Sequence, residues 1–218
     1  MKAYVFDAYG TLFDVHSAVR RHGHRIGDQA GHLSDIWRIK QLEYTWVRTL
    51  TDAYLDFERV TAQALDFAMS KCGITDAPLR ADLLAAYDRV EAYDDVAPTL
   101  LALKATGAKL AILSNGTDRM LQAALDHAGL VAMFDAVLSV HALHRFKTDP
   151  KVYAMATAHF GLEPGEVSFQ SSNRWDIAGA TRFGFRTIWI NRTAQPDEYP
   201  DLPPHLVLPG LHRLAQGI

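Results

Sequence analysis

Short apolar runs alternate with amphipathic stretches in the second half of the chain, and this alternation limits the fold more than any other feature. The apolar runs lie at 110–113 (LAIL), 137–140 (VLSV), 167–169 (VSF) and 187–190 (TIWI). Between them lie stretches that predict helices: 117–128, a helix opened by Asp149 and Pro150, and 176–183. Strands that alternate with helices form a parallel sheet that helices cover on both faces and that binds ligands at the carboxyl ends of its strands. The sequence therefore predicts an α/β fold, and the residues that follow each strand are candidate site residues.

The first strand of this sheet is predicted far from the others, at Ala3–Phe6. Between about Asp14 and Asp95 we find helical periodicity and no convincing strand. We therefore expect a core domain, residues 1–13 and 96–218, that is interrupted by a helical cap subdomain, residues 14–95. Within the cap, Ser34 is a candidate N-cap for a helix that carries Arg38, and the Pro-rich tail from residue 196 is expected to run over the surface before a last short element.

Composition indicates a globular enzyme or binding protein with small-molecule partners. The chain has 218 residues, of which 49% are hydrophobic and 22% charged, and its net charge is −3 without a dense basic run, which argues against nucleic acid as a partner. No window resembles a membrane span, and the first apolar run is better read as a strand than as a signal peptide, so we expect a cytoplasmic protein. Cys72, the single cysteine, is expected to be a packing residue.

We expect no metal and no cofactor. Four histidines lie close together in HSAVRRHGHRIGDQAGH, but no cysteine or acidic cluster completes a metal site. The glycines form neither a dinucleotide-binding fingerprint nor a phosphate-binding loop.

Polar residues follow the predicted strands and should meet at one edge of the sheet. Each of them alone could be a helix cap or a solvated charge. Their repeated placement after successive strands favours a shared nucleophilic site in which a lysine keeps two carboxylates ionised. These residues are Asp7 after YVF, Ser114 and Asn115 after LAIL, Lys147 ahead of DPKVY, and Ser171, Asn173 and Asp176 in SSNRWD.

Four stretches, FDAYGTL, LSNG, FKTDPKVY and SSNRWDIAGA, resemble the four motifs of the haloacid dehalogenase superfamily, and specifically those of the L-2-haloacid dehalogenases. The similarity continues through WRIKQLEYTWVRTL in the insert and so covers most of the chain. The resemblance implies a Rossmann-like core with a helical cap, a homodimer, and hydrolysis of short (S)-2-haloacids to (R)-2-hydroxyacids with inversion.

Most members of that superfamily are phosphatases that use two aspartates in the first motif together with Mg²⁺, and the sequence departs from them. Tyr9 occupies the position of the second aspartate, and a phenol with an ordinary pKa near 10 is a poor acid for a leaving alkoxide. A halide leaves as a stable anion that needs no proton, so dehalogenation permits this change. A phosphatase whose acid comes from elsewhere, and a silent binding module, are the alternatives.

The resemblance also implies roles for individual residues. Asp7 would displace the halide from C2 of the substrate and form an ester, while Thr11 and Lys147 position it. Arg38, although arginine is more often a snorkelling surface residue, would receive the halide together with Asn115 and Phe57. Ser114 and backbone amides would hold the substrate carboxylate. The apolar side of the pocket would be lined by Tyr9, Leu42 and Trp175.

The second half-reaction needs a water molecule aimed at the ester carbonyl carbon. Asp176, supported by Lys147, Ser171 and Asn173, is the candidate for orienting and deprotonating that water. Tyr153 could reach the same cluster, although its position in VYAMA is also that of a half-buried helix residue. The sequence leaves open the chain length of the substrate and the preferred halide, including fluoride from fluoroacetate.

Overall fold

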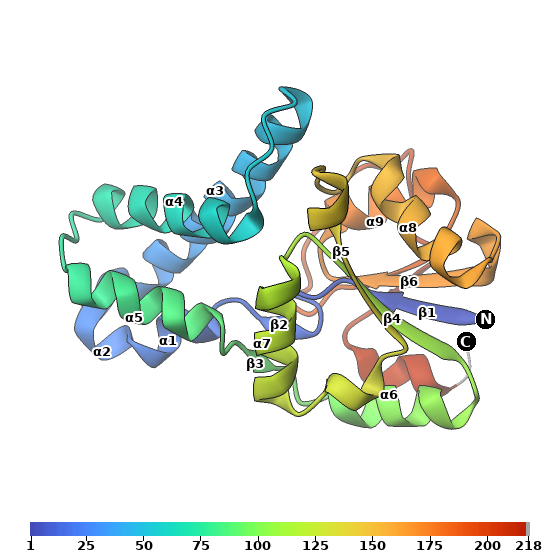
Figure 1. Cartoon of the computed structure of the whole chain (residues 1–218). Coiled ribbons are helices and arrows are strands. Elements are labelled where there is room, and N and C mark those ends of the chain that lie inside the picture. The colour runs from blue at the N-terminus through green and yellow to red at the C-terminus, as the bar shows by residue number, and fades with distance from the viewer. Residues whose placement is uncertain (217–218) are drawn as a thin grey trace.

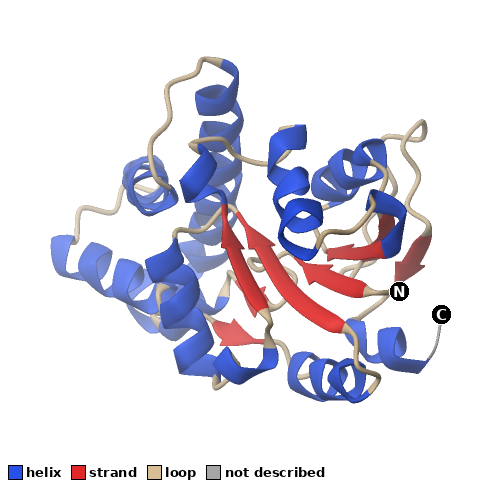
Figure 2. Cartoon of the chain, turned by 45° about the vertical axis from the view of Figure 1, so that its right-hand side comes forward, coloured by secondary structure: helices blue, strands red, loops and turns tan. Residues whose placement is uncertain are grey.

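A six-stranded parallel sheet forms the centre of the molecule in the computed structural model, which describes residues 1–216 (Figures 1 and 2). Its strand order is β5-β4-β1-β6-β7-β8, and every neighbouring pair is parallel. The predicted α/β class is therefore confirmed, and β1 begins and ends where the sequence indicated. The strands are β1 (Ala3–Phe6), β4 (Lys109–Ser114), β5 (Ala136–Ser139), β6 (Val167–Ser171), β7 (Arg186–Ile190) and β8 (Leu206–Leu208).

Helices cover both faces of the sheet. In Figure 1, α8 (Pro150–Phe160) and α9 (Arg174–Phe183) lie above it, while α6 (Val96–Ala105) and the 3-10 helix η5 (Leu211–Gln216) lie below. The helix α7 (Asp118–Ala128) begins where its cap predicts, because the Thr117 side chain accepts a hydrogen bond from the Met120 amide. Further 3-10 helices are η2 (Val131–Met133), η3 (Val140–Leu143) and η4 (Pro164–Glu166).

Five α-helices and one 3-10 helix lie between the first strand and the rest of the sheet, at the left of Figure 1, and we call them the helical insertion. Its two longest helices pack against each other through Thr61, whose carbonyl oxygen accepts from Trp37 Nε1 and whose hydroxyl accepts from Gln41 Nε2, both at 2.9 Å. The insertion comprises α1 (Ser17–Arg21), α2 (Gly23–Ile26), the 3-10 helix η1 (Gly27–Gln29), α3 (Ala30–Leu50), α4 (Phe57–Lys71) and α5 (Ala77–Tyr87).

The expectation that Ser34 caps a helix is wrong. The helix α3 begins at Ala30, four residues earlier, and Ser34 lies inside its first turns. Its hydroxyl is 2.7 Å from Nδ1 of His16, so the tertiary contact, not the end of the helix, explains this polar residue.

The expectation that the stretch from Asp14 to Asp95 contains no strand needs correction, and the tail adds a short strand to the sheet. The chain leaves and re-enters the core through a short antiparallel ladder between β2 (Phe13–Asp14) and β3 (Glu91–Ala92), where the sequence indicated no strand. The Pro-rich tail runs over the surface into β8, which pairs with β7 and forms one edge of the sheet. Strands of two or three residues are too short to display an alternating pattern, so periodicity could not identify them.

The hydrophobic core runs from the sheet into the insertion without a break. Cys72 is buried in it at the end of α4, as expected. Within residues 1–216, no helix has both the length and the apolar character that a membrane crossing requires. Residues 217 and 218, the end of the predicted core domain, lie outside the described part.

Candidate active site

Asp7 lies at the carboxyl edge of the sheet, directly after β1. Its amide still donates to the Gln170 carbonyl at 2.9 Å, which extends the ladder between β1 and β6 by one residue. The side chain is 8% exposed, so the carboxylate is held by protein groups and not by bulk water. The parallel topology brings the ends of β4 and β6 to the same edge, as predicted.

Both carboxylate oxygens of Asp7 accept hydrogen bonds. Lys147 Nζ donates to Oδ1 at 3.0 Å. Oδ2 accepts from Asn173 Nδ2 at 2.7 Å, from Thr11 Oγ1 at 3.0 Å and from Ser171 Oγ at 3.4 Å. These donors come from three separate parts of the chain, and together they fix the orientation of the carboxylate.

Lys147 also donates to Oδ2 of Asp176 at 2.8 Å, and so lies between two carboxylates. Burial alone would lower the pKa of the Lys147 ammonium, but Asp176 and Asp7 outweigh it and hold that pKa above its ordinary value. The lysine is 1% exposed and Asp176 is fully buried. A permanent positive charge therefore joins the two acids.

Asp176 differs from Asp7 in its surroundings. Burial raises the pKa of Asp176 to about 6, with the negative charge of Asp7 adding to the rise and Lys147 opposing it. Tyr153 donates to Oδ1 of Asp176 at 2.8 Å. A carboxylate with a pKa near the working pH is suited to accept a proton from water, because it is ionised yet basic.

Arg38 reaches this cluster from α3 of the insertion. Its guanidinium donates to the Tyr9 carbonyl oxygen at 3.1 Å and to Asn173 Oδ1 at 3.3 Å. The alternative of a snorkelling surface arginine is therefore wrong. A cation therefore lies in the cluster around Asp7, where an anion could be received.

Asn115 and Ser114 follow β4 and make different contacts. The Asn115 side-chain oxygen accepts from the Lys147 amide at 3.0 Å, so its amide nitrogen points elsewhere and has no partner among residues 1–216. The Ser114 hydroxyl accepts from the Gly116 amide at 3.1 Å, within its own turn, and has no hydrogen bond to Asp7. Asn115 thus joins the cluster through its contact with Lys147, and Ser114 precedes Asn115 at the end of β4.

Aromatic rings form an apolar wall beside the cluster. The rings of Tyr9 and Phe57 lie 5.9 Å apart, and Tyr87, which sequence reasoning missed, stacks on Tyr9 at 5.5 Å. No pattern around Tyr87 distinguishes it from an ordinary core residue of α5. Leu42 is half-buried on α3, and Trp175 packs edge-on against Trp46 at 5.6 Å.

Tyr9 is tightly confined in this wall. A Cβ atom on Gly116 would lie 2.8 Å from Tyr9 Cε2, so the ring needs a glycine there. Burial raises the pKa of Tyr9 well above its ordinary value, and its hydroxyl has no hydrogen-bond partner within the described chain. This phenol therefore stays protonated and is a weaker acid than a free tyrosine.

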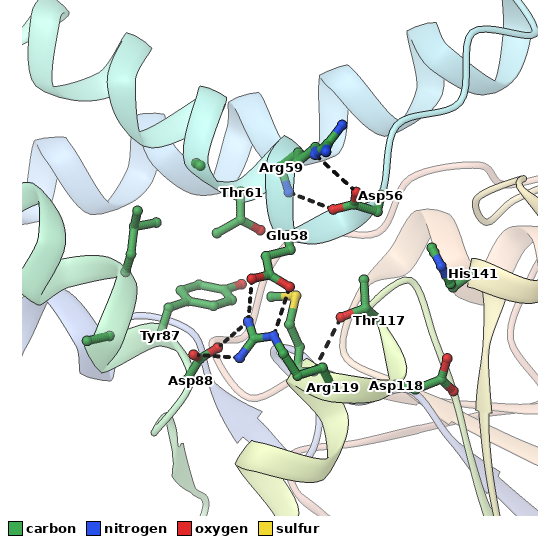
Figure 3. A pocket seen from close by; sticks show the side chains of 14 residues that line it. Asp56, Glu58, Arg59, Thr61, Tyr87, Asp88, Thr117, Asp118, Arg119 and His141 are labelled. Carbon is green, nitrogen blue, oxygen red and sulfur yellow. Dashed lines mark hydrogen bonds and ion pairs between the residues drawn. The ribbon is translucent and has the colours of Figure 1, made fainter.

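A cleft of about 760 Å³ opens between the insertion and the core, and Figure 3 shows its lining. Arg119 of α7 crosses it and pairs with Glu58 at 2.8 Å and Asp88 at 2.9 Å. Tyr87 lines the cleft and stacks on Tyr9, which connects the cleft with the apolar wall. Asp7 and Asp176 do not line it.

Comparisons with known proteins agree on one family. Residues 1–184 match the model of the haloacid dehalogenase-like hydrolases. (S)-2-haloacid dehalogenase 1 of Pseudomonas sp. (strain CBS-3) is 47% identical over 217 residues, which cover 99% of this chain and 96% of that protein.

Solved structures agree with the sequence comparison. A crystal structure of a dehalogenase is 46% identical and has a TM-score of 0.97 over 98% of this chain and 95% of that one. L-2-haloacid dehalogenase from Xanthobacter autotrophicus, solved with chloropropionic acid covalently bound, is 38% identical and has a TM-score of 0.90 over 99% and 97% of the two chains. The chain therefore belongs to the haloacid dehalogenase-like hydrolases and, among them, to the (S)-2-haloacid dehalogenases.

Proposed function

We propose that this protein hydrolyses short (S)-2-haloacids to (R)-2-hydroxyacids through an ester on Asp7. The observation that carries the proposal is the position of Lys147, 3.0 Å from Asp7 and 2.8 Å from Asp176. Lys147 holds together two carboxylates: Asp7, which can attack the substrate, and Asp176, which can accept a proton. The similarity to named (S)-2-haloacid dehalogenases supports the choice of substrate.

In the first step a carboxylate oxygen of Asp7 attacks C2 of the substrate from the side opposite the halogen. The carbon–oxygen bond forms as the carbon–halogen bond breaks, and the halide leaves with the bonding electrons. Arg38, the Asn115 amide and the ring edge of Phe57 receive it. Thr11 and Lys147 keep Asp7 in position through their hydrogen bonds at 3.0 Å.

In the second step Asp176 takes a proton from water, whose oxygen bonds to the ester carbonyl carbon. Ser171 and Asn173 help to hold the ester and the water, and Tyr153 supports Asp176. The acyl–oxygen bond breaks and the alkoxide product takes the proton from Asp176. The Asp7 carboxyl group releases its proton to solvent and becomes a carboxylate again, so one proton is released per turnover. The configuration inverted in the first step is retained, because the bond between C2 and oxygen stays intact.

Binding residues complete the proposed pocket. Ser114 and the amides of the turn after Asp7 hold the substrate carboxylate, and the substituent on C2 lies against the wall formed by Tyr9, Leu42 and Trp175. Residues 14–95 act as a cap over a core of residues 1–13 and 96–218, because Arg38 of α3 completes a site that otherwise belongs to the core.

A phosphatase reaction fits the site less well. Such a reaction needs an acid for the leaving alkoxide, and the residue in that position is Tyr9, a phenol whose pKa burial raises well above the ordinary value. The Tyr9 carbonyl oxygen is already paired with Arg38 and Asn173. A halide needs no acid.

The proposal extends to assembly and location. Apolar side chains of α3 are exposed along one face, with Ile39 at 59%, Trp46 at 38% and Leu50 at 86%, and we expect a second copy of this chain to cover them in a homodimer. Light scattering would test this, with Leu50→Glu expected to give monomers.

We also expect the enzyme to be cytoplasmic, because its one cysteine is free and buried, and cell fractionation would test that.

The activity test is halide release, measured by ion chromatography with EDTA present, from (S)- and (R)-2-chloropropionate and from fluoroacetate in separate reactions. We expect chloride from the (S) acid and none from the (R) acid, and fluoride would extend the reaction to fluoroacetate. No halide from any of them, followed by phosphate release from a phosphomonoester once Mg²⁺ is restored, would replace this function by a phosphatase.

A further inference from the structure

The segment that precedes Lys147 is held by the insertion as well as by the core. Arg145 pairs with Asp52, which follows α3, at 2.7 Å. The ring of Tyr54 stacks on His144 at 4.7 Å. The connection between α3 and α4 therefore lies directly on the segment that presents the lysine.

Two successive backbone amides of this segment are fixed from opposite sides. The Phe146 amide donates to Thr49 Oγ1 of α3 at 3.1 Å, and the Lys147 amide donates to Asn115 Oδ1 of the core at 3.0 Å. The Phe146 side chain is 1% exposed, with its ring 5.2 Å from that of Tyr54. The backbone at Lys147 is thereby fixed before the side chain extends between the two carboxylates.

Thr49 differs from the other threonines near the end of α3. The hydroxyls of Thr45 and Thr51 donate back to the carbonyls of Leu42 and Val47 in their own helix, both at 2.7 Å, as threonine hydroxyls in helices often do. The Thr49 oxygen instead accepts a hydrogen bond from a residue 97 positions away. Helix geometry alone does not account for this contact.

We propose that Thr49 is a positioning residue for Lys147: its contact with the Phe146 amide couples the position of the insertion to the alignment of the two carboxylates, Asp7 and Asp176. The inference rests on the proposed function for its catalytic consequence. Arg38 and Thr49 would then give α3 two separate tasks: Arg38 meets the leaving group, and Thr49 fixes the lysine.

Thr49→Val tests this, because valine keeps the shape and removes the hydrogen-bond acceptor. A less fixed ammonium opposes the rise of the Asp176 pKa less well, while Asp7 and Tyr153, the other groups that face Asp176, are unchanged. We expect kcat to fall. We also expect the midpoint of the acidic side of its pH profile to shift to higher pH by about half a unit. Thr49→Ser should restore both, and Thr51→Val, which removes only a bond within the helix, should change neither.

A second readout separates this inference from the proposed function. The Asp176 carboxyl carbon, followed by ¹³C NMR and assigned with Asp176→Asn, should titrate at higher pH in Thr49→Val than in the wild type, and thermal unfolding should show that the variant is folded. If the wild type released no halide, the function would fail, while this titration would still decide the role of Thr49. An unchanged titration in folded Thr49→Val would overturn the proposal.

Discussion

Lys147 Nζ lies 2.8 Å from Oδ2 of Asp176 in a fully buried contact. The pair has one consequence that steady-state kinetics can measure. Because burial and Asp7 raise the pKa of Asp176 to about 6 in spite of the lysine, this acid becomes protonated as the pH falls through that value. A protonated Asp176 cannot accept a proton from water, so we predict that kcat for halide release falls to half its plateau near pH 6. A kcat that rises as the pH drops below 6 would exclude Asp176 as the base.

Tyr153→Phe should move that acidic limb to higher pH. The Tyr153 hydroxyl donates to the Asp176 carboxylate at 2.8 Å and so favours its ionised form. Phenylalanine keeps the ring and removes the donor. The midpoint of the acidic side of the kcat profile should therefore shift to higher pH by about half a unit. Tyr199→Phe, at an exposed position in the tail, is the matched control and should leave the profile unchanged.

Asp176→Asn should separate the two half-reactions. Asp7 can still displace the halide, but no base activates the water, so we predict one rapid release of about one halide per active site and then turnover slowed by roughly a hundredfold or more. Mass spectrometry of the quenched protein should find the ester on Asp7. Asp201→Asn, at an exposed position, should turn over normally. Full turnover by Asp176→Asn would assign the base to another residue.

Arg38→Lys should slow the release of halide itself. Lysine keeps the charge but not the planar guanidinium, whose Nη2 atom donates to both the Tyr9 carbonyl and Asn173. We expect the initial rate of halide release to fall roughly a hundredfold while hydrolysis of preformed ester is less affected. Arg59→Lys on α4, where the side chain is 73% exposed, is the control. Equal slowing of both steps would assign Arg38 a general structural role.

Much of the fold could be predicted from the sequence because its strands are buried apolar runs between helices. β1 matched its prediction at both ends. The helix predicted from residue 117 starts at Asp118 with Thr117 as its N-cap, and the helix predicted to open at Asp149 and Pro150 starts there. The ladder of β2 with β3 and the edge strand β8 could not be predicted from the sequence, because strands of two or three residues are too short to show an alternating hydrophobic pattern. Ser34 was misread since its polar partner, His16, is a tertiary neighbour.

The predicted site residues were found by their positions after strands and by resemblance, and the structure brings Asp7, Lys147 and Asp176 into direct contact. What the sequence did not indicate depends on contacts between distant segments. Thr49 reads as one more polar residue of an amphipathic helix, and only the fold brings its hydroxyl to the Phe146 amide. Tyr87 likewise has the pattern of a core residue, and only the fold brings the end of α5 to Tyr9.

The central claim, that Asp7 carries the substrate as an ester, is tested most directly by turnover of (S)-2-chloropropionate in water enriched in ¹⁸O. Attack of water on the ester carbonyl carbon places solvent oxygen in the Asp7 carboxylate, so the peptide that contains Asp7 should gain ¹⁸O over many turnovers. In a single turnover with excess enzyme, the product should carry unlabelled oxygen from Asp7. An unlabelled Asp7 peptide, with ¹⁸O in the product from the first turnover, would mean that water attacks C2 directly and would contradict the account.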